Sequence, residues 1–401
     1  NPLSGYADSG KPDHCGESTC ALLRESHIIA DCQSTAPFSM PALPAQIRIS
    51  ALLTYCRAGF EQESAAELHD QLAPLDLSAN FTVIANSAYV LCEFAQPQAA
   101  SRLASIAWTQ LIFARQLLWV VGDIGNLPNR DRLTPIVAAL EALPLQYDDL
   151  WLETPDTNDG KTLSGFCRRF APLLEAPLAE KRLLRRDQVG LPRLHLFFPQ
   201  QERCLIALSV AGNRSDWPMG IPRLKMPFEA PSRSTLKLAE ALLTLLDETT
   251  QRRLLKPGMR AVDLGAAPGG WTWQLANRGL RVTAVDNGPL KGAVRDDPLV
   301  EHVRADGFKY RPRKPVDWMV CDMVEQPVRI TQLVCDWLIQ GWARQVVFNL
   351  KLPMKKRYQE IQRCFAQLDQ KLHKAGIDYQ LHARQLYHDR EEITVYLGRK
   401  G

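Results

Sequence analysis

The 401-residue sequence lacks any run of about twenty apolar residues, the length that a helix needs to cross a bilayer. Its most apolar stretch, residues 107–122, is interrupted by Gln110, Arg115 and Gln116. We therefore expect no membrane insertion. Charge of one sign is also scarce, because the formal net charge is only +4 at pH 7. Such a balance permits a nucleic-acid partner without requiring one.

Patterns typical of metal sites and disulfide frameworks are missing as well. The ten cysteines contain no C-x-x-C pair, and the eight histidines form no cluster with the spacing of metal ligands. We expect reduced thiols, a cytoplasmic location and no metal. Nothing in the sequence requires a dimer, so we expect a monomer.

Residues 1–45 differ from the rest in being rich in Pro, Ser and Gly, with little hydrophobic periodicity. They contain no basic segment followed by an apolar one, so a secretory signal is not predicted. Two interpretations stay open. The segment is a disordered tail, or translation starts at Met40 and the upstream part is mis-annotated.

Two small units are predicted between residues 46 and 211. In the unit 46–105, a strand, an amphipathic helix and a hairpin follow one another, an order typical of an α+β ferredoxin-like sandwich. The unit 106–211 combines short strands with a helix over 162–184.

A connector rich in Pro and Gly, residues 212–231, is predicted to separate these units from the C-terminal half. Its Trp217 and Phe228 are expected to pack between domains, with stacking on an unpaired base as the alternative. From Lys181 to Lys237 the chain has eleven Lys or Arg against four acidic residues. This local excess could contact several phosphates at once.

Residues 232–401 alternate between helix and strand, which predicts a doubly wound α/β sheet with helices on both faces. Polar residues stand at or just beyond the carboxyl ends of the predicted strands, where ligands bind in such sheets. They are Asp263, Asp286, Asp306, Asp322 and Lys351.

The stretch 259–278 predicts a strand ending at Asp263, a tight turn from Gly265 to Gly270, and a helix beginning at Trp271. Such a turn presents free amides at a helix N-terminus and lets a ligand approach the backbone closely. The second glycine of the dinucleotide pattern G-x-G-x-x-G is absent, which argues against NAD.

The sequence Asp-Leu-Gly-Ala-Ala-Pro-Gly-Gly-Trp of residues 263–271 resembles the cofactor motif of FtsJ-type ribose 2′-O-methyltransferases. The resemblance implies a Rossmann-like domain that uses S-adenosylmethionine. It also implies the cofactor contacts Ser234, Asp263, Gly265, Ala267, Pro268, Gly269, Gly270, Asp286, Asp306 and Asp322.

Two of these residues have roles that follow from position. Asp286, which ends the second strand, suits ribose hydroxyls. Asp306 either accepts from an adenine amino group or caps a turn before Gly307.

Four residues match the Lys-Asp-Lys-Glu catalytic tetrad of this family. They are Lys237, Asp322, Lys351 and Glu392. Glu391 stays an alternative to Glu392, because adjacent strand residues point to opposite faces. The sequence leaves open whether Lys351 is a proton acceptor or an orienting group.

Longer stretches, among them residues 219–225, 232–237, 348–357 and 386–392, resemble bacterial enzymes that methylate a cytidine ribose of 23S rRNA. That resemblance implies a target in the peptidyl-transferase region, and 23S rRNA or a large-subunit precursor as partner. The unit 106–211, with Phe-Cys-Arg-Arg-Phe at 166–170, resembles a THUMP RNA-binding domain. The plainer interpretation of these arginines is a solvated helix face.

The sequence also bears on three other functions. Transfer RNA as the substrate stays open, because a THUMP-like module recognises RNA shape without naming a sequence. A non-catalytic RNA-binding assembly factor is disfavoured by the intact Lys351 and glycine turn. Base methylation is disfavoured because Asp322-Met-Val-Glu replaces a Pro-Pro-Tyr pattern and because Cys321 is expected to be buried.

Overall fold

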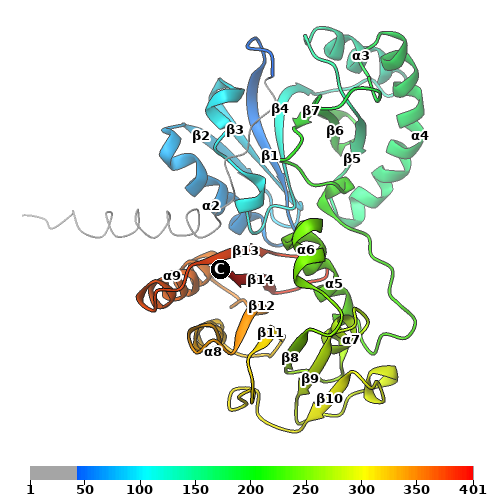
Figure 1. Ribbon diagram of the computed structural model, residues 1–401. Coiled ribbons are helices and arrows are strands. Elements are labelled where there is room, and N and C mark those ends of the chain that lie inside the picture. Colours follow the sequence, from blue (N-terminus) through cyan, green and yellow to red (C-terminus); the bar gives the residue numbers. More distant parts are fainter. Residues whose placement is uncertain (1–42, 401) are drawn as a thin grey trace, which may run out of the picture.

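The structure is a computed structural model that describes residues 43–400, and it contains two seven-stranded sheets, one in each half of the chain (Figure 1). The predictions for residues 1–42 lie outside the described residues. Within residues 43–400, no helix has the length and apolar character needed to cross a bilayer.

The N-terminal sheet has the strand order β2-β3-β1-β4-β7-β6-β5. Its strands are β1 Arg48–Tyr55, β2 Ala79–Val83, β3 Tyr89–Ala99, β4 Gln116–Ile124, β5 Leu150–Glu153, β6 Arg193–Gln200 and β7 Arg203–Ser209, with helices α2 Glu61–Leu72, α3 Leu133–Glu141 and α4 Asn158–Glu180. All neighbouring strands are antiparallel except β5 and β6. Because β4 pairs with both β1 and β7, the strands of the predicted units 46–105 and 106–211 form one continuous sheet. The boundary between those units stays a prediction.

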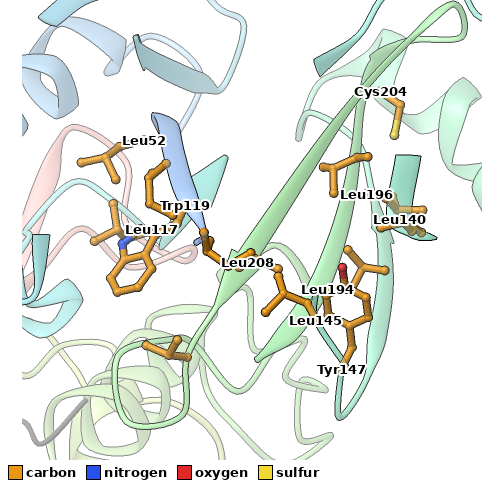
Figure 2. Packing of buried hydrophobic residues seen from close by; sticks show 14 of the residues in the cluster. Leu52, Leu117, Trp119, Leu140, Leu145, Tyr147, Leu194, Leu196, Cys204 and Leu208 are labelled. Atoms are coloured by element: carbon orange, nitrogen blue, oxygen red, sulfur yellow. The ribbon is translucent and has the colours of Figure 1, made fainter. Parts of the chain in front are cut away.

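Buried aliphatic and aromatic side chains hold this sheet and its helices together. Figure 2 shows Leu52 of β1 beside Trp119 of β4, and Leu196 of β6 close to Leu140 of α3. These side chains are at most 2% exposed. Removing such a residue from water contributes roughly 1.5–3 kcal/mol.

The C-terminal sheet has the order β10-β9-β8-β11-β12-β14-β13. Its strands are β8 Arg260–Leu264, β9 Arg281–Val285, β10 Val300–Val303, β11 Val316–Cys321, β12 Ala343–Lys351, β13 Tyr379–Arg384 and β14 Glu392–Arg399. Strands β8 to β12 are parallel, and β14 runs antiparallel to β12 and β13. The helices are α5 Ser234–Leu245, α6 Glu248–Leu254, α7 Gly270–Ala276, α8 Pro327–Ile339 and α9 Arg357–Lys374.

Helices cover both faces of this sheet. On one face, Leu238 of α5 and Trp271 of α7 belong to a buried cluster with Val320 of β11. On the other, Trp337 of α8 and Phe365 of α9 pack with core residues of β11 and β12. The predicted doubly wound α/β architecture is confirmed.

The two halves meet through a short segment before β4. Ile112 and Phe113 are buried in the same apolar cluster as α8 and α9 of the other half. Arg384 at the end of β13 donates to the carbonyl of Ala114 at 3.1 Å, and the amide of Gln385 donates to the carbonyl of Ile112 at 2.7 Å. The edge strand β13 therefore lies directly beneath the N-terminal sheet (Figure 1).

The connector 212–231 runs along one side of the molecule from β7 to α5 (Figure 1). The amide of Met219 anchors it by donating to the buried Glu153 at 2.5 Å. Phe228 is fully exposed, so the expectation that it packs between domains is wrong. Trp217 is half-buried.

Most of the basic residues between Lys181 and Lys237 form ion pairs within the protein. Within residues 43–400, seven of the eleven basic residues from Lys181 to Lys237 lie in ion pairs: Lys181, Arg185, Arg186, Arg193, Arg203, Arg214 and Lys237. The connector keeps Arg223 and Lys225 exposed, and Arg233 is exposed just beyond it.

Candidate active site

The turn between β8 and α7 needs glycine at particular positions. Gly265 has φ of 77° and Gly269 has φ of 111°, both in the left-handed region that side chains rarely adopt. A Cβ atom on Gly265 would lie 2.5 Å from Cγ of Met323. A Cβ atom on Gly270 would collide with the hydroxyls of Ser232 and Ser234. The backbone is therefore kept bare where α5 and α7 approach each other.

A pocket of about 280 Å³ lies beside this turn. Its lining residues are Ser232, Ser234, Asp263, Gly265, Ala266, Ala267, Pro268, Trp271 and Asp322. Six of the ten predicted cofactor contacts belong to this lining, while Gly269, Gly270, Asp286 and Asp306 do not.

Asp263, at the floor of the pocket, is only 1% exposed. Its Oδ2 atom accepts from the Thr272 hydroxyl at 2.6 Å. Its Oδ1 atom is buried and has no hydrogen-bond partner among the described residues. Burial raises the pKa of Asp263 to about 7, and the nearby charge of Asp322 acts in the same direction. The floor of the pocket thus carries a buried oxygen that is free to form a hydrogen bond with a polar ligand.

Asp286 and Asp306 shape the surrounding loops. Asp286 accepts from the amide of Ala267 at 3.0 Å and from that of Gly288 at 2.7 Å. Asp306 is exposed and accepts from the amide of Phe308 at 2.8 Å. This hydrogen bond is the turn cap that the sequence offered as one of two roles for Asp306. Each carboxylate retains further lone pairs for a ligand.

The four predicted tetrad residues, from α5, β12, β14 and the position just after β11, meet at the carboxyl ends of β11 and β12. Lys351 donates to Oδ1 of Asp322 at 2.5 Å and to Oε2 of Glu392. Lys237 on α5 pairs with the other oxygens, Oε1 of Glu392 and Oδ2 of Asp322, the latter at 3.5 Å. Two cations therefore bridge the same two carboxylates, and the group is balanced in charge.

Cross-strand pairing distinguishes the two adjacent glutamates. Glu392 is the register partner of Lys351 and is 4% exposed. The side chain of Glu391 is 61% exposed and pairs with Arg357 at 2.7 Å. Glu391 therefore lies outside the tetrad geometry.

Opposing effects set the protonation of the tetrad. Burial alone lowers the pKa of Lys351, but the charges of Asp322 and Glu392 outweigh it, so that the pKa is raised. Burial raises the pKa of Glu392, but Lys351 and Lys237 outweigh it, so that the pKa is lowered. At neutral pH Lys351 is an ammonium and Glu392 a carboxylate.

Three buried polar residues behind the tetrad were missed from the sequence: Asn349, Asp389 and Thr394. Asn349 is 0% exposed and donates to Oδ1 of Asp322 at 2.8 Å. One signal was available. A polar residue within the apolar run 346–350, two positions before Lys351, points to the same face of the strand as that lysine.

Cysteine and metal chemistry find little support in the described part of the chain. Its seven cysteines are all buried. Burial raises the pKa of Cys321 to about 12, which disfavours a thiolate nucleophile beside Asp322. Between residues 43 and 400, no group of three or more His, Cys, Asp or Glu is placed to hold a metal ion.

The fold and the site together define a methyltransferase of the FtsJ-like class, and the FtsJ-like methyltransferase family matches residues 230–375. The ferredoxin-like domain of RlmM matches residues 49–118, and the N-terminal domain of ribosomal RNA large subunit methyltransferase M matches residues 131–210. The chain belongs to the ribosomal RNA large subunit methyltransferase M family. The likeness of the unit 106–211 to a THUMP domain stays a prediction.

Relatives of that name match most of the chain. The protein from Aromatoleum aromaticum is 52% identical over 362 residues, which is 89% of this chain and 98% of the relative. The protein from Xanthomonas campestris pv. campestris strain B100 is 49% identical over 348 residues, 86% of this chain and 99% of the relative. Among solved structures, TrmN from Thermus thermophilus covers 87% of this chain and 99% of its own at 16% identity, with a TM-score of 0.33, which is too low to bear on function.

Proposed function

We propose that this protein transfers the methyl group of S-adenosylmethionine to the 2′-hydroxyl of a cytidine ribose in 23S rRNA. The observation that carries the proposal is the charge-balanced tetrad, with Lys351 at its centre, beside the pocket of the glycine turn. The name shared by the relatives points to RNA of the large ribosomal subunit. Such a substrate would place the protein in the cytoplasm and make 23S rRNA, or a precursor of the subunit, its partner.

The pocket suits S-adenosylmethionine on three counts. The bare Gly270 leaves room for the hydroxyls of Ser232 and Ser234, which line the pocket and which a Cβ atom there would displace. The free Oδ1 atom of Asp263 offers a buried acceptor. Asp286, at the end of β9, is in the position that suits ribose hydroxyls. We assign the adenine amino group to Asp306, in addition to its role as a turn cap.

When bound, the cofactor supplies an electrophilic methyl carbon on a positively charged sulfur. An acceptor 2′-oxygen would have to lie in line with that methyl group and lose its proton as it is methylated, so the protein must orient the hydroxyl and take up the proton. Lys351 begins as an ammonium that orients a lone pair of the 2′-oxygen. The positively charged sulfur of a bound cofactor would lower the pKa of Lys351. After giving its own proton to solvent, Lys351 accepts the hydroxyl proton.

Exposed residues around the tetrad suit an RNA strand. Val324 follows Asp322 and is 89% exposed, and Met354 follows Lys351 and is 93% exposed. Phe228 of the connector is also fully exposed, and an exposed aromatic ring is a platform for an unpaired base. These features favour RNA over a small substrate. The choice of ribosomal over transfer RNA comes from the relatives' name.

The test uses labelled S-adenosylmethionine and unmodified 23S rRNA, with 2′-O-methylation mapped by resistance to alkaline hydrolysis. We expect one cytidine to become resistant. The Lys351→Ala variant should react at least about 100-fold more slowly, because proton transfer contributes that much or more. Its cofactor affinity, measured by calorimetry, should stay within about twofold. Lys374→Ala, which changes an exposed lysine of α9, is the matched control.

Four results would contradict the proposal. Label in a base would exclude the ribose as acceptor. Label in transfer RNA alone would exclude ribosomal RNA. Full activity of Lys351→Ala would remove the proton acceptor from the mechanism, and binding of cofactor without any labelling by the wild type would favour the assembly-factor alternative.

A further inference from the structure

A chain of buried polar side chains leads from the core to the tetrad. Asn349 of β12 and Thr394 of β14 are register partners, and Lys351 and Glu392 form a pair two residues further on. Because strand side chains alternate with a period of two, both pairs lie on the same face. Asn349 and Thr394 are 0% exposed, and Asp389 behind them is 1% exposed. Polar groups buried this deeply need hydrogen-bond partners.

The amide of Asn349 reaches the oxygens that hold Lys351. Its Nδ2 atom donates to Oδ1 of Asp322 at 2.8 Å and lies 3.4 Å from Oε2 of Glu392. These are the same two atoms that accept from Nζ of Lys351. Asn349 therefore contacts both carboxylates from the side opposite to solvent and shares their negative charge with the lysine.

The proton of the Thr394 hydroxyl fixes the orientation of this amide. Oγ1 of Thr394 lies 2.8 Å from Oδ1 of Asn349 and 3.0 Å from Oδ2 of Asp389. The opposite amide orientation would turn Oδ1 of Asn349 toward two carboxylate oxygens. The hydroxyl must therefore donate to Asn349, since an amide oxygen carries no proton.

With its single proton given to Asn349, Thr394 needs a donor for its oxygen. Asp389 can serve only as a neutral carboxylic acid. Burial first, and the nearby charge of Glu392 second, raise the pKa of Asp389 well above its usual value. The amide of Leu386 donates to Oδ2 of Asp389 at 2.9 Å, which leaves Oδ1, 3.1 Å from Thr394, to carry the proton. Every member of the chain then has a partner.

We infer that Asn349 is a positioning residue for methyl transfer, held in orientation by Thr394 and Asp389, which fixes Asp322 and Glu392 around Lys351. The inference rests on the proposed function of the tetrad. Without the Asn349 amide, Oδ1 of Asp322 and Oε2 of Glu392 would keep Lys351 but lose their second donor. They would then hold the proton of Lys351 more firmly and would no longer be fixed in position.

The charged groups around this chain come from α5, β11, β12 and the β13–β14 side. They are Lys237, Glu240, Asp322, Lys351, Asp389 and Glu392. Glu240 is engaged by the amides of residues 387 and 388 and by His388. The remaining charges are those of the tetrad itself. The loss of Asn349 should therefore change the protonation and the position of Lys351.

The test measures kcat, both KM values and the pH profile of kcat for Asn349→Ala and for the pair Thr394→Val and Thr394→Ser. Asn349→Ala should lower kcat roughly tenfold to a hundredfold, the cost of a misplaced catalytic group. The cofactor KM should change by a smaller factor than kcat, since Asn349 is absent from the pocket lining and reaches it only through Asp322. The acidic limb of the profile should move up by about one pH unit, because Lys351 holds its proton more firmly.

The two threonine variants separate hydrogen bonding from packing. Thr394→Val keeps the volume and removes the hydroxyl, so it should lower kcat and shift the limb in the same direction as Asn349→Ala. Thr394→Ser keeps the hydroxyl and should stay within about threefold of the wild type. If Asn349→Ala does not fold, this pair still decides the question.

Unchanged kcat and an unshifted limb in Asn349→Ala, or equal losses in Thr394→Ser and Thr394→Val, would overturn the inference. Lys351→Ala is assayed alongside. If Lys351→Ala is inactive while Asn349→Ala behaves as wild type, only the positioning role fails. If Lys351→Ala is active, the proposed function of the tetrad fails.

Discussion

Replacing Glu67 by glutamine is expected to destabilise the protein more at pH 5 than at pH 8. Glu67 lies on α2 at the contact between the two halves and is 4% exposed. Its carboxyl group accepts from the amides of residues 112–114, at 2.6 Å from Ile112 and 2.8 Å from Ala114. Burial nevertheless outweighs these bonds and raises the pKa of Glu67 to about 7.

The sign of the effect follows from proton binding. With a pKa above the usual 4.5, the folded protein binds this proton more tightly than the unfolded chain does. The stabilisation is fully present below pH 4.5 and is lost as the pH rises through 7. Between pH 5 and pH 8 the wild type loses about 2.5 kcal/mol of unfolding free energy through this group. The Glu67→Gln variant has no such titration.

The assay is urea unfolding of the wild type and Glu67→Gln at both pH values. Other titrating groups cancel when the two destabilisations are subtracted, and the difference should be about 2.5 kcal/mol. Gln62→Ala, at an exposed and non-titrating position of the same helix, is the control, and its effect should differ by under about 0.5 kcal/mol between the two pH values. Equal destabilisation at both pH values, or a larger one at pH 8, would mean that the amide donors outweigh burial.

Two further predictions concern the site. Gly270→Ala should weaken cofactor binding at least about tenfold in calorimetry, because the new methyl group meets the hydroxyls behind the turn, whereas Gly125→Ala, with open space around it, should bind normally. Glu392→Gln should lower kcat roughly 100-fold and Glu391→Gln less than about twofold, since only Glu392 contacts the tetrad lysines; comparable losses in both would refute this assignment.

Local sequence determined much of the C-terminal half. Strand, turn and helix follow one another within residues 259–278, and the glycines at 265 and 269 are needed because the backbone there has positive φ. Apolar runs ending in Asp263, Asp322 and Lys351 predicted a parallel sheet with its site at one edge. These features depend on neighbours in the chain, so the sequence alone reveals them.

The tertiary structure alone decided how distant segments share a site. The alternation along a strand says that Glu391 and Glu392 face opposite ways, but only the pairing of β14 with β12 turns Glu392 toward Lys351. The same pairing sets Asn349 beside Thr394. Likewise β4 joins two predicted units into one sheet, because pairing partners far apart in the chain are chosen by packing. The ion pairs of the basic residues between Lys181 and Lys237 also depend on tertiary structure, while their contact with phosphates stays a prediction.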